Sequence, residues 1–568
     1  MENAIISTLS LSREGAVEFV SESYFKIIIA CAILVCIITR TYSGFRSCFR
    51  GTNADEAWRP KTLPYWVPYF GHALSLGFCR RSLLKHARDT TPEPVFSLYI
   101  CGQRHNIITS PSLAKALLAE QKSSIVPNAF ATYAMERVFG APKSTRKLNR
   151  AEFDAQCRSM EFQMQDPLAS DCSSATIQKI EQNMPNMYTF LLECCRSSGT
   201  LCCNCDDGIM GEDFMEALPN TPDDIRKFNN NFNAIILGIQ RWVPFPGLPT
   251  SYRSRRRLLH GMAAFHSAFA VAENGHDPGF DWRQIDEVSE FMQDHCRAWK
   301  DAGLSATSMA AESLALLWAM DTKLNTIIFW NLLHILADGP IHSRIMKEIA
   351  PYSQAGRPNA GETGFRLPEP PRVSLDIDHL IYCPLLKATY YETLRLHSCP
   401  ITYRKITKEF KLTESASDAK IANRKQQTYQ FKEGEFIAIP QTLHNTDSHY
   451  FEDPEEFEPE RFLAEKAVDT SESSEKSRPS KKRESFTAQP ELALKIPETW
   501  TVYGGGGHTV SQDGKFAERI TLGFVAGLLA MWDIQPAKGL GWKIPKRRTG
   551  GLVYEPQTDI RVRIKSKV

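Results

Sequence analysis

The segment from Cys383 to Ser398 reads "CPLLKATYYETLRLHS", and its apolar spacing predicts a helix over residues 384–397. Glu392 and Arg395 are three positions apart on this helix, so their side chains share one face and can be held as an ion pair. A pair of this kind on an exposed helix face is common. The Glu392–Arg395 spacing therefore becomes informative only together with motifs that lie later in the chain.

A second arginine lies further along, in a proline-rich context. Arg461 stands in the segment "FEPERF", whose prolines argue against a helix, and it can complete a buried cluster with Glu392 and Arg395. A buried charge cluster persists only when its members satisfy one another. We therefore assign these three residues a structural role.

A glycine-rich segment is the third element in this order. Residues 501–520 read "TVYGGGGHTVSQDGKFAERI", in which four glycines precede a segment typical of a helix start. Glycine has no Cβ, so such a loop lets the backbone approach another group closely.

The rest of the body reads as mainly α with a small β region. Helices are predicted around 110–121, 174–196, 221–242, 255–272, 283–301, 307–338, 341–350 and 384–397. Short strands are predicted within 95–109, 436–440 and 559–565.

The N-terminal region carries an apolar run. "YFKIIIACAILVCIIT", residues 24–39, holds one charge, Lys26, and at helical rise spans about 24 Å, a little less than a bilayer core. Three glutamates precede it and three arginines come after it: Glu14, Glu18, Glu22, Arg40, Arg46 and Arg50. The positive-inside rule then predicts a single-pass anchor with the body in the cytoplasm, and the reversed charge order argues against a cleaved signal peptide.

The local composition of the sequence divides the chain into segments. We expect a luminal N-terminus at 1–23, an anchor at 24–40, a basic and proline-rich hinge at 41–77, extended over 59–77, and a folded domain at 78–568. A stretch rich in Ser, Lys and Glu at about 464–488 predicts a disordered insertion.

Charge and cysteine content exclude several classes of function. The 67 Lys and Arg residues nearly balance 65 Asp and Glu residues, so no net field favours nucleic acid. Fifteen cysteines in a large chain indicate a reduced compartment rather than a disulfide framework. The group at residues 194–205 lacks two separated C-x2-C pairs, so we expect no metal site there.

In this order, the motifs resemble the cytochrome P450 family, the membrane-anchored haem-thiolate monooxygenases. The resemblance runs from the anchor and hinge through a long central helix, E-T-L-R and P-E-R-F, to the glycine loop. The segment "LLWAMDTKLNTIIFWNLLHILAD" (316–338) resembles the branch that contains sterol 7-hydroxylase-like proteins, prostacyclin-synthase-like proteins and many fungal biosynthetic enzymes. This resemblance implies a cytochrome P450 fold after the anchor, haem as cofactor and a reductase partner.

The loop departs from the family pattern F-x-x-G-x-x-x-C-x-G. Tyr503 stands for the Phe, Gly504 and Gly506 lie in the glycine run, and Val510 aligns with the cysteine that would bind the iron. Counting backward from Phe516 places serine or glutamine at the ligand instead, and the chain has no cysteine after Cys399. His508 offers an imidazole as an alternative ligand.

The central helix departs as well. The family places an Asn-Thr pair near the iron to deliver protons to bound oxygen, and alignment on the flanking tryptophans puts Lys323 and Leu324 there. Two nearby pairs are candidate substitutes, although a shift of two positions turns a side chain by about 200°. These candidates are Asp321 with Thr322 and Asn325 with Thr326. Arg404 is a candidate to bind a haem propionate, and a surface arginine beside a strand explains it equally well.

Four hypotheses are consistent with these features. The first is non-oxidative chemistry, such as cyclisation, isomerisation or dehydration, on a hydrophobic small molecule of terpenoid, sterol or polyketide type in fungal secondary metabolism. The others are a haem monooxygenase with an atypical ligand, a catalytically silent membrane scaffold, and an altered gene sequence around the loop. We expect an endoplasmic-reticulum location, and a reductase partner only if haem binds.

Overall fold

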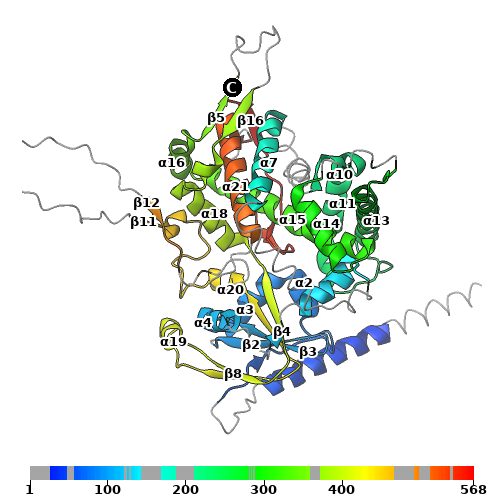
Figure 1. Ribbon diagram of the computed structural model, residues 1–568. Helices are drawn as coiled ribbons and strands as arrows, with labels where there is room; N and C mark the ends of the chain where they lie inside the picture. Colours follow the sequence, from blue (N-terminus) through cyan, green and yellow to red (C-terminus); the bar gives the residue numbers. More distant parts are fainter. Residues whose placement is uncertain are drawn as a thin grey trace, which may run out of the picture. The chain divides into compact units, whose positions relative to one another are not determined.

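The computed structural model describes residues 26–47, 57–91, 93–119, 125–126, 129–142, 168–186, 210–279, 282, 285, 288–357, 371–465, 492–497, 500, 512–537 and 541–568. These residues are mostly helical, with short strands (Figure 1). The predicted fold class, mainly α with a small β region, is confirmed. The chain forms two compact units, the first made of residues 1–114, 121–127 and 403–439 and the second of the remainder.

The first unit begins with the helix Lys26–Ser47, which is long and apolar enough to cross a membrane. Its end contacts the next segment of the chain, because Ser43 Oγ hydrogen bonds to Tyr65 and the Arg40 guanidinium lies 5.4 Å from the centre of the Trp66 ring. Part of the range predicted as a hinge, 41–77, is helical. The helix continues to Ser47, and α2 (Ala73–Phe78) occupies the last part of the hinge.

A mixed sheet organises the first unit, with the strand order β1-β2-β3-β10-β7-β4. Strands β2 and β3 form an antiparallel hairpin whose turn residues Cys101 and Gly102 both have positive φ. Strand β10 joins β3 in parallel register, with Ile437 opposite Asn106. The strands are β1 (Lys61–Thr62), β2 (Val95–Ile100), β3 (Gln103–Ile108), β4 (Ile125–Val126), β7 (Ile401–Ile406) and β10 (Phe436–Pro440). The other elements are α3 (Arg80–Thr90), α4 (Pro111–Ala119), β8 (Phe410–Thr413), α19 (Ala416–Ile421) and β9 (Thr428–Phe431).

The second unit is built around helix α15 (Ala306–Ala337). The Ser305 hydroxyl caps its start by accepting a hydrogen bond from Ser308 N, and Asp338 at its end caps the next helix through Ile341 N. The other helices are α5 (Ala129–Ala134), η1 (Met135–Phe139), α7 (Leu168–Asn183), η3 (Met184–Asn186), α10 (Glu212–Ala217), α11 (Thr221–Asn229), α12 (Phe232–Ile236), α13 (Leu248–Glu273), α14 (Glu290–Asp301), α16 (Gly339–Ile349), α17 (Ile377–Leu380), α18 (Pro384–His397), α20 (Gln441–Asn445), η6 (Pro459–Phe462) and α21 (Gln512–Met531).

Short antiparallel pairs complete the second unit. They are β5 (Ser353–Gly356) with β6 (Arg372–Leu375), β11 (Leu463–Glu465) with β12 (Leu492–Leu494), β13 (Trp532–Pro536) with β16 (Val562–Ser566), and β14 (Arg547–Arg548) with β15 (Glu555–Pro556). The β11–β12 pair joins the two sides of the predicted insertion, most of which lies outside the described residues.

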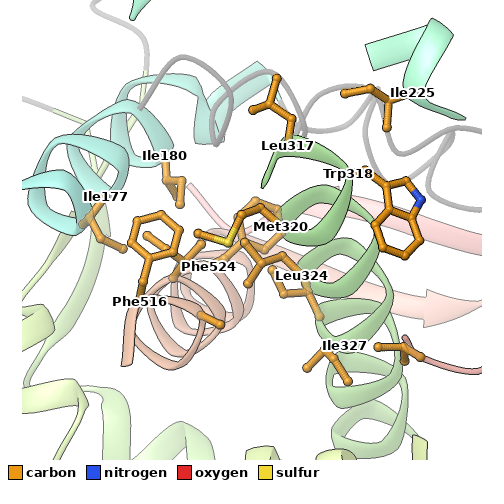
Figure 2. Packing of buried hydrophobic residues seen from close by; sticks show 14 of the residues in the cluster. Ile177, Ile180, Ile225, Leu317, Trp318, Met320, Leu324, Ile327, Phe516 and Phe524 are labelled. Carbon is orange, nitrogen blue, oxygen red and sulfur yellow. The ribbon is translucent and has the colours of Figure 1, made fainter. Parts of the chain in front are cut away.

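The core lies between α15, α21 and α7. Figure 2 shows Met320 and Leu324 of α15 directed toward Phe516 and Phe524 of α21, with Ile177 and Ile180 of α7 beside them. Helix α21 lies so close to α7 that a Cβ on Gly523 would approach Ile177 to 2.5 Å. This contact explains why glycine occupies that position.

Several helix predictions differ from the structure. The predicted helix at 221–242 is divided into α11 (Thr221–Asn229) and α12 (Phe232–Ile236), and α13 begins at Leu248, before the predicted 255. The "PERF" segment forms one turn of 3-10 helix, η6, because Pro459 lies in its first turn, where a missing N–H costs no hydrogen bond. Helix α14 starts after Ser289, later than the predicted 283, because the Ser289 hydroxyl accepts a hydrogen bond from Met292 N.

Candidate functional site

Helix α18 holds the predicted charge pair in the core. The guanidinium of Arg395 and the carboxylate of Glu392 are both fully buried, and two hydrogen bonds of 2.6 and 2.7 Å join them. Arg395 also donates to three main-chain carbonyls, those of Asn445, Pro454 and Glu456. The pair therefore fixes the chain that runs from α20 toward η6.

Arg461 completes the cluster from η6. Its Nε lies 3.5 Å from Glu392 Oε1, and its Nη2 lies 2.7 Å from Glu458 Oε2. Glu392 Oε1 also accepts a hydrogen bond from the main-chain N–H of Glu458. The structure thus brings together the three residues that the sequence analysis grouped.

A buried histidine pair lies between α15 and α18. His334 Nε2 and His397 Nε2 are 2.9 Å apart, so one nitrogen donates and the other accepts. The Trp330 ring stacks on His397 at 4.0 Å and the Phe457 ring stacks on His334 at 4.2 Å. Burial lowers the pKa of His334 to about 3, which keeps the imidazole neutral. Sequence reasoning missed this pair, because 63 residues separate its members.

Trp318 packs within an aromatic cluster on another face of α15. Its ring stacks on Phe232 at 4.2 Å, and the Phe139 ring lies 5.5 Å away. Its indole N–H donates to Asn229 Oδ1 at 3.0 Å, and Asn229 in turn donates to Glu555. A Cβ on Gly551 would come within 2.7 Å of the Trp318 ring, so the chain must be glycine at that point.

The polar candidates on α15 divide between two faces. Asp321 and Asn325 are buried and hydrogen bonded to each other, whereas Thr322, Lys323 and Thr326 are partly exposed. The Thr322 hydroxyl donates to Trp318 O at 2.6 Å, and that of Thr326 donates to Thr322 O at 2.9 Å. The two candidate pairs are therefore split, because neighbouring residues of a helix point about 100° apart.

One face of α15 is partly exposed from Glu312 to Thr326. Its side chains are partly exposed, while those on the remaining faces over the same range are buried. They recur at helical spacing: Glu312, Ala315, Leu316, Ala319, Thr322, Lys323 and Thr326. We call these seven residues the accessible stripe. Leu324, the other residue at the predicted proton-delivery position, is buried and directed toward α21 (Figure 2).

The loop candidates lie outside the described residues: Tyr503, Gly504, Gly506, His508 and Val510. The cysteines at 194–205 lie outside them too. Arg404 lies on β7 in the first unit, where its Nη1 donates to Tyr403 O at 3.0 Å and burial lowers its pKa. In the part of the chain that the structure describes, no group of three His, Cys, Asp or Glu side chains is placed to hold a metal ion.

Comparison with known proteins covers most of the chain. Residues 60–486 match the family described as cytochrome P450, a range that ends before the glycine loop. The cytochrome P450 monooxygenase poxD of Penicillium oxalicum is 22% identical over 505 residues, which cover 86% of this chain and 89% of that protein. The cytochrome P450 monooxygenase efuG of Hormonema carpetanum is 22% identical over 90% of this chain and 91% of its own.

A human relative matches over a shorter range. Prostacyclin synthase of Homo sapiens is 21% identical over 70% of this chain and 75% of its own. The family match spans well over half of the chain, and it includes α15, α18 and the buried Glu392–Arg395–Arg461 cluster. This chain belongs to the cytochrome P450 family.

Proposed function

We propose that this protein acts on a hydrophobic small molecule of terpenoid, sterol or polyketide type, by non-oxidative chemistry, in fungal secondary metabolite biosynthesis. One observation carries the proposal: residues 400–568 contain no cysteine, although the family's iron ligand belongs in the loop that precedes α21. The two fungal relatives support the setting, because both are cytochrome P450 monooxygenases by name.

Cytochrome P450 proteins normally bind haem. A thiolate ligand gives that haem its capacity to cleave the O–O bond. Among the described cysteines, burial raises the pKa of both Cys296 and Cys383 to about 12 and keeps these two thiols protonated. Because residues 400–568 contain no cysteine, the loop before α21 does not fit a thiolate-ligated haem.

The central helix supports the same proposal. The position that would deliver protons to oxygen holds Lys323 and Leu324, and Leu324 is buried against α21. The Thr322 and Thr326 hydroxyls donate their hydrogens to main-chain carbonyls of α15 itself. What α15 retains is the accessible stripe, whose alanines and leucine suit an apolar ligand.

The proposed chemistry requires that the chain bind and orient its substrate without oxygen activation. Small apolar side chains of the stripe would contact the substrate body, while the charge cluster on α18 holds the scaffold in place. A reductase partner has a purpose only if haem binds. Nucleic acid is not among the proposed partners, given the balanced charge of the chain.

A carbon monoxide spectrum and an anaerobic conversion assay test this proposal together. Protein from a verified transcript, supplied with haem and reduced, is expected to lack the absorption band that thiolate ligation produces. It is also expected to convert terpenoid, sterol or polyketide precursors without oxygen or reductase. A thiolate band in the wild-type protein would refute the proposal, and absence of both band and conversion would favour a silent scaffold.

The variant Val510→Cys is the matched control for the spectrum. It restores a thiol at the position that aligns with the family ligand. A gain of the thiolate band in this variant alone would show that the missing cysteine is what prevents haem ligation.

We further propose that residues 24–40 anchor the protein in the endoplasmic reticulum membrane, with residues 78–568 in the cytoplasm. The helix Lys26–Ser47 supports the anchor, since its mean hydropathy is 2.0 and 6% of its apolar window is buried. The arginines after the apolar run support the orientation.

Deletion of residues 1–47 tests the anchor. We expect the truncated protein to move from the membrane fraction to the soluble fraction on cell fractionation, because it loses the apolar helix. Full retention in the membrane fraction would show that another surface binds the membrane.

A further inference from the structure

We propose that a groove beside α19 on the first unit binds the phosphate group of a phosphate monoester. The groove is formed by α19 and the loop that follows it, within the chain that connects β8 to β9 (Figure 1). Its volume is about 480 Å³, the size of a small-molecule site. Seven residues line it, and we call them the basic groove: Ala416, Ala419, Lys420, Asn423, Arg424, Lys425 and Gln426.

The charges of the basic groove favour an anion. Its described lining includes Lys420 and Lys425, whose side chains are exposed, and it includes no Asp or Glu. Within the part of the chain that the structure describes, no ion pair joins either ammonium group to a carboxylate. The two acids of the same segment, Glu414 and Asp418, are buried. The two ammonium groups therefore give the groove a positive charge that a bound anion would neutralise.

Glu414 holds the third cation of the groove in its wall. Glu414 is 1% exposed, and its carboxylate accepts hydrogen bonds from Nη2 and Nε of Arg424. Its main-chain carbonyl accepts a hydrogen bond from Gln426 Nε2 at 2.6 Å. Because Glu414 neutralises Arg424, recognition of an anion falls to Lys420 and Lys425.

Buried Asp418 attaches α19 to the start of α4. Asp418 Oδ2 accepts hydrogen bonds from Ser110 Oγ and, at 2.9 Å, from Ser112 N. The Ser415 hydroxyl caps α19 by accepting a hydrogen bond from Asp418 N at 3.1 Å. These contacts order the walls of the groove before a ligand arrives, so binding costs less conformational entropy than it would on a mobile loop.

The end of α19 offers little opposition to an anion. The carbonyls of Asp418, Ala419 and Lys420 accept hydrogen bonds from the main-chain N–H groups of residues 422–424. Asn423 allows this reversal of the chain with a φ of 51°, in the left-handed region that asparagine tolerates. The carbonyls that end a helix carry its negative pole, and here three of them already have donors.

Size and charge select the class of ligand. A stable protein interface takes about 20–30 residues from each side, whereas seven residues of one segment line this groove, which favours a small anion over an acidic protein. A phosphate monoester carries about two negative charges near neutral pH and so can meet both ammonium groups at once. Such a group belongs either to a soluble metabolite or to a phospholipid headgroup.

Isothermal titration calorimetry of the full-length, detergent-solubilised protein tests the inference. The probes are sn-glycerol 3-phosphate and dioctanoyl phosphatidic acid, which share the phosphate monoester and differ in the acyl chains. We expect the wild-type protein to bind both. Similar affinities would identify a soluble phosphate as the ligand, and about tenfold tighter binding of phosphatidic acid would identify a lipid headgroup.

Variants assign the binding to the two lysines. Lys420→Met and Lys425→Met should each weaken binding about fivefold, as for one exposed ion pair, and the double variant should weaken it about 25-fold. Lys408→Met is the matched control, because this exposed lysine of the same unit does not line the groove, and it should bind both probes as the wild type does. Circular dichroism melting curves establish that each variant is folded.

Three results would overturn the inference. The first is that the wild-type protein binds neither probe above the detergent background. The second is that the double variant keeps the wild-type affinity. The third is tighter binding of a capped tetrapeptide with two adjacent glutamates, which would assign the groove to an acidic protein segment. The carbon monoxide spectrum and the anaerobic conversion assay are independent of all three, so this inference and the proposed function fail separately.

Discussion

Replacing Arg395 by methionine is expected to lower the free energy of unfolding by about 3–5 kcal/mol, because it leaves the Glu392 carboxylate buried without its partner. The loss extends beyond the ion pair. The carbonyls of Asn445, Pro454 and Glu456 each lose a donor at the same time. Urea unfolding of the solubilised protein, followed by circular dichroism, measures the change.

Arg461→Gln is the matched control for Arg395. Arg461 contacts Glu392 at 3.5 Å, and its closer partner Glu458 is 55% exposed, so we expect a loss of about 1 kcal/mol or less. The double variant Glu392→Leu with Arg395→Met should recover part of the loss, since no buried charge remains. Equal losses for Arg395→Met and Arg461→Gln would contradict the central role given to Arg395.

Acidification is expected to destabilise the second unit by roughly 5 kcal/mol between pH 7 and pH 4.5, through two buried histidines. Burial lowers the pKa of His334 to about 3, with the Arg547 charge adding to the effect, and it lowers the pKa of His266 to about 4. Both values lie below the ordinary 6.5 of unfolded chain, so the unfolded state binds more protons as the pH falls. The stabilisation that the neutral histidines provide is fully present above about pH 6.5. It is lost as the pH falls, down to about 4 for His266 and about 3 for His334.

The surroundings of each histidine explain why protonation is resisted. His266 Nε2 lies 2.8 Å from the Ser313 hydroxyl and its Nδ1 lies 3.4 Å from Cys296 Sγ, neither of which offers a negative charge. His334 is stacked on Phe457 and paired with His397. Burial raises the pKa of Glu348, which acts in the opposite sense, so the effect must be isolated by variants.

Thermal melting at a series of pH values makes this comparison. His334→Phe should lose about half of the pH dependence, because phenylalanine keeps the stacking on Phe457 and cannot bind a proton. His276→Gln, at an exposed position, should leave the dependence unchanged. A melting temperature that stays constant from pH 7 to pH 4.5 would contradict the assignment.

The spacing of apolar residues along the sequence was sufficient to predict the helices that form the scaffold. The sequence predicts a helix at 384–397 and the structure has α18 at Pro384–His397, and the predicted 307–338 corresponds to α15 at Ala306–Ala337. Both are long runs with apolar residues at helical spacing; α15 begins after a serine cap and α18 begins with a proline in its first turn. Proline-rich composition, in contrast, does not reveal the short helix α2 at the end of the predicted hinge.

By itself, the sequence determined the helical framework, the pairing of Glu392 with Arg395 on one face, and the absence of a cysteine in the loop before α21. These depend on helix period and residue identity, which are local. Only the tertiary structure decided which face of α15 stays accessible, which partners satisfy Arg395, and that His334 meets His397. It also decided that the chain forms two compact units, each built from segments that are separate in the sequence. The physical reason is that burial and long-range hydrogen bonds depend on how distant segments pack, and helical spacing carries no information about that packing.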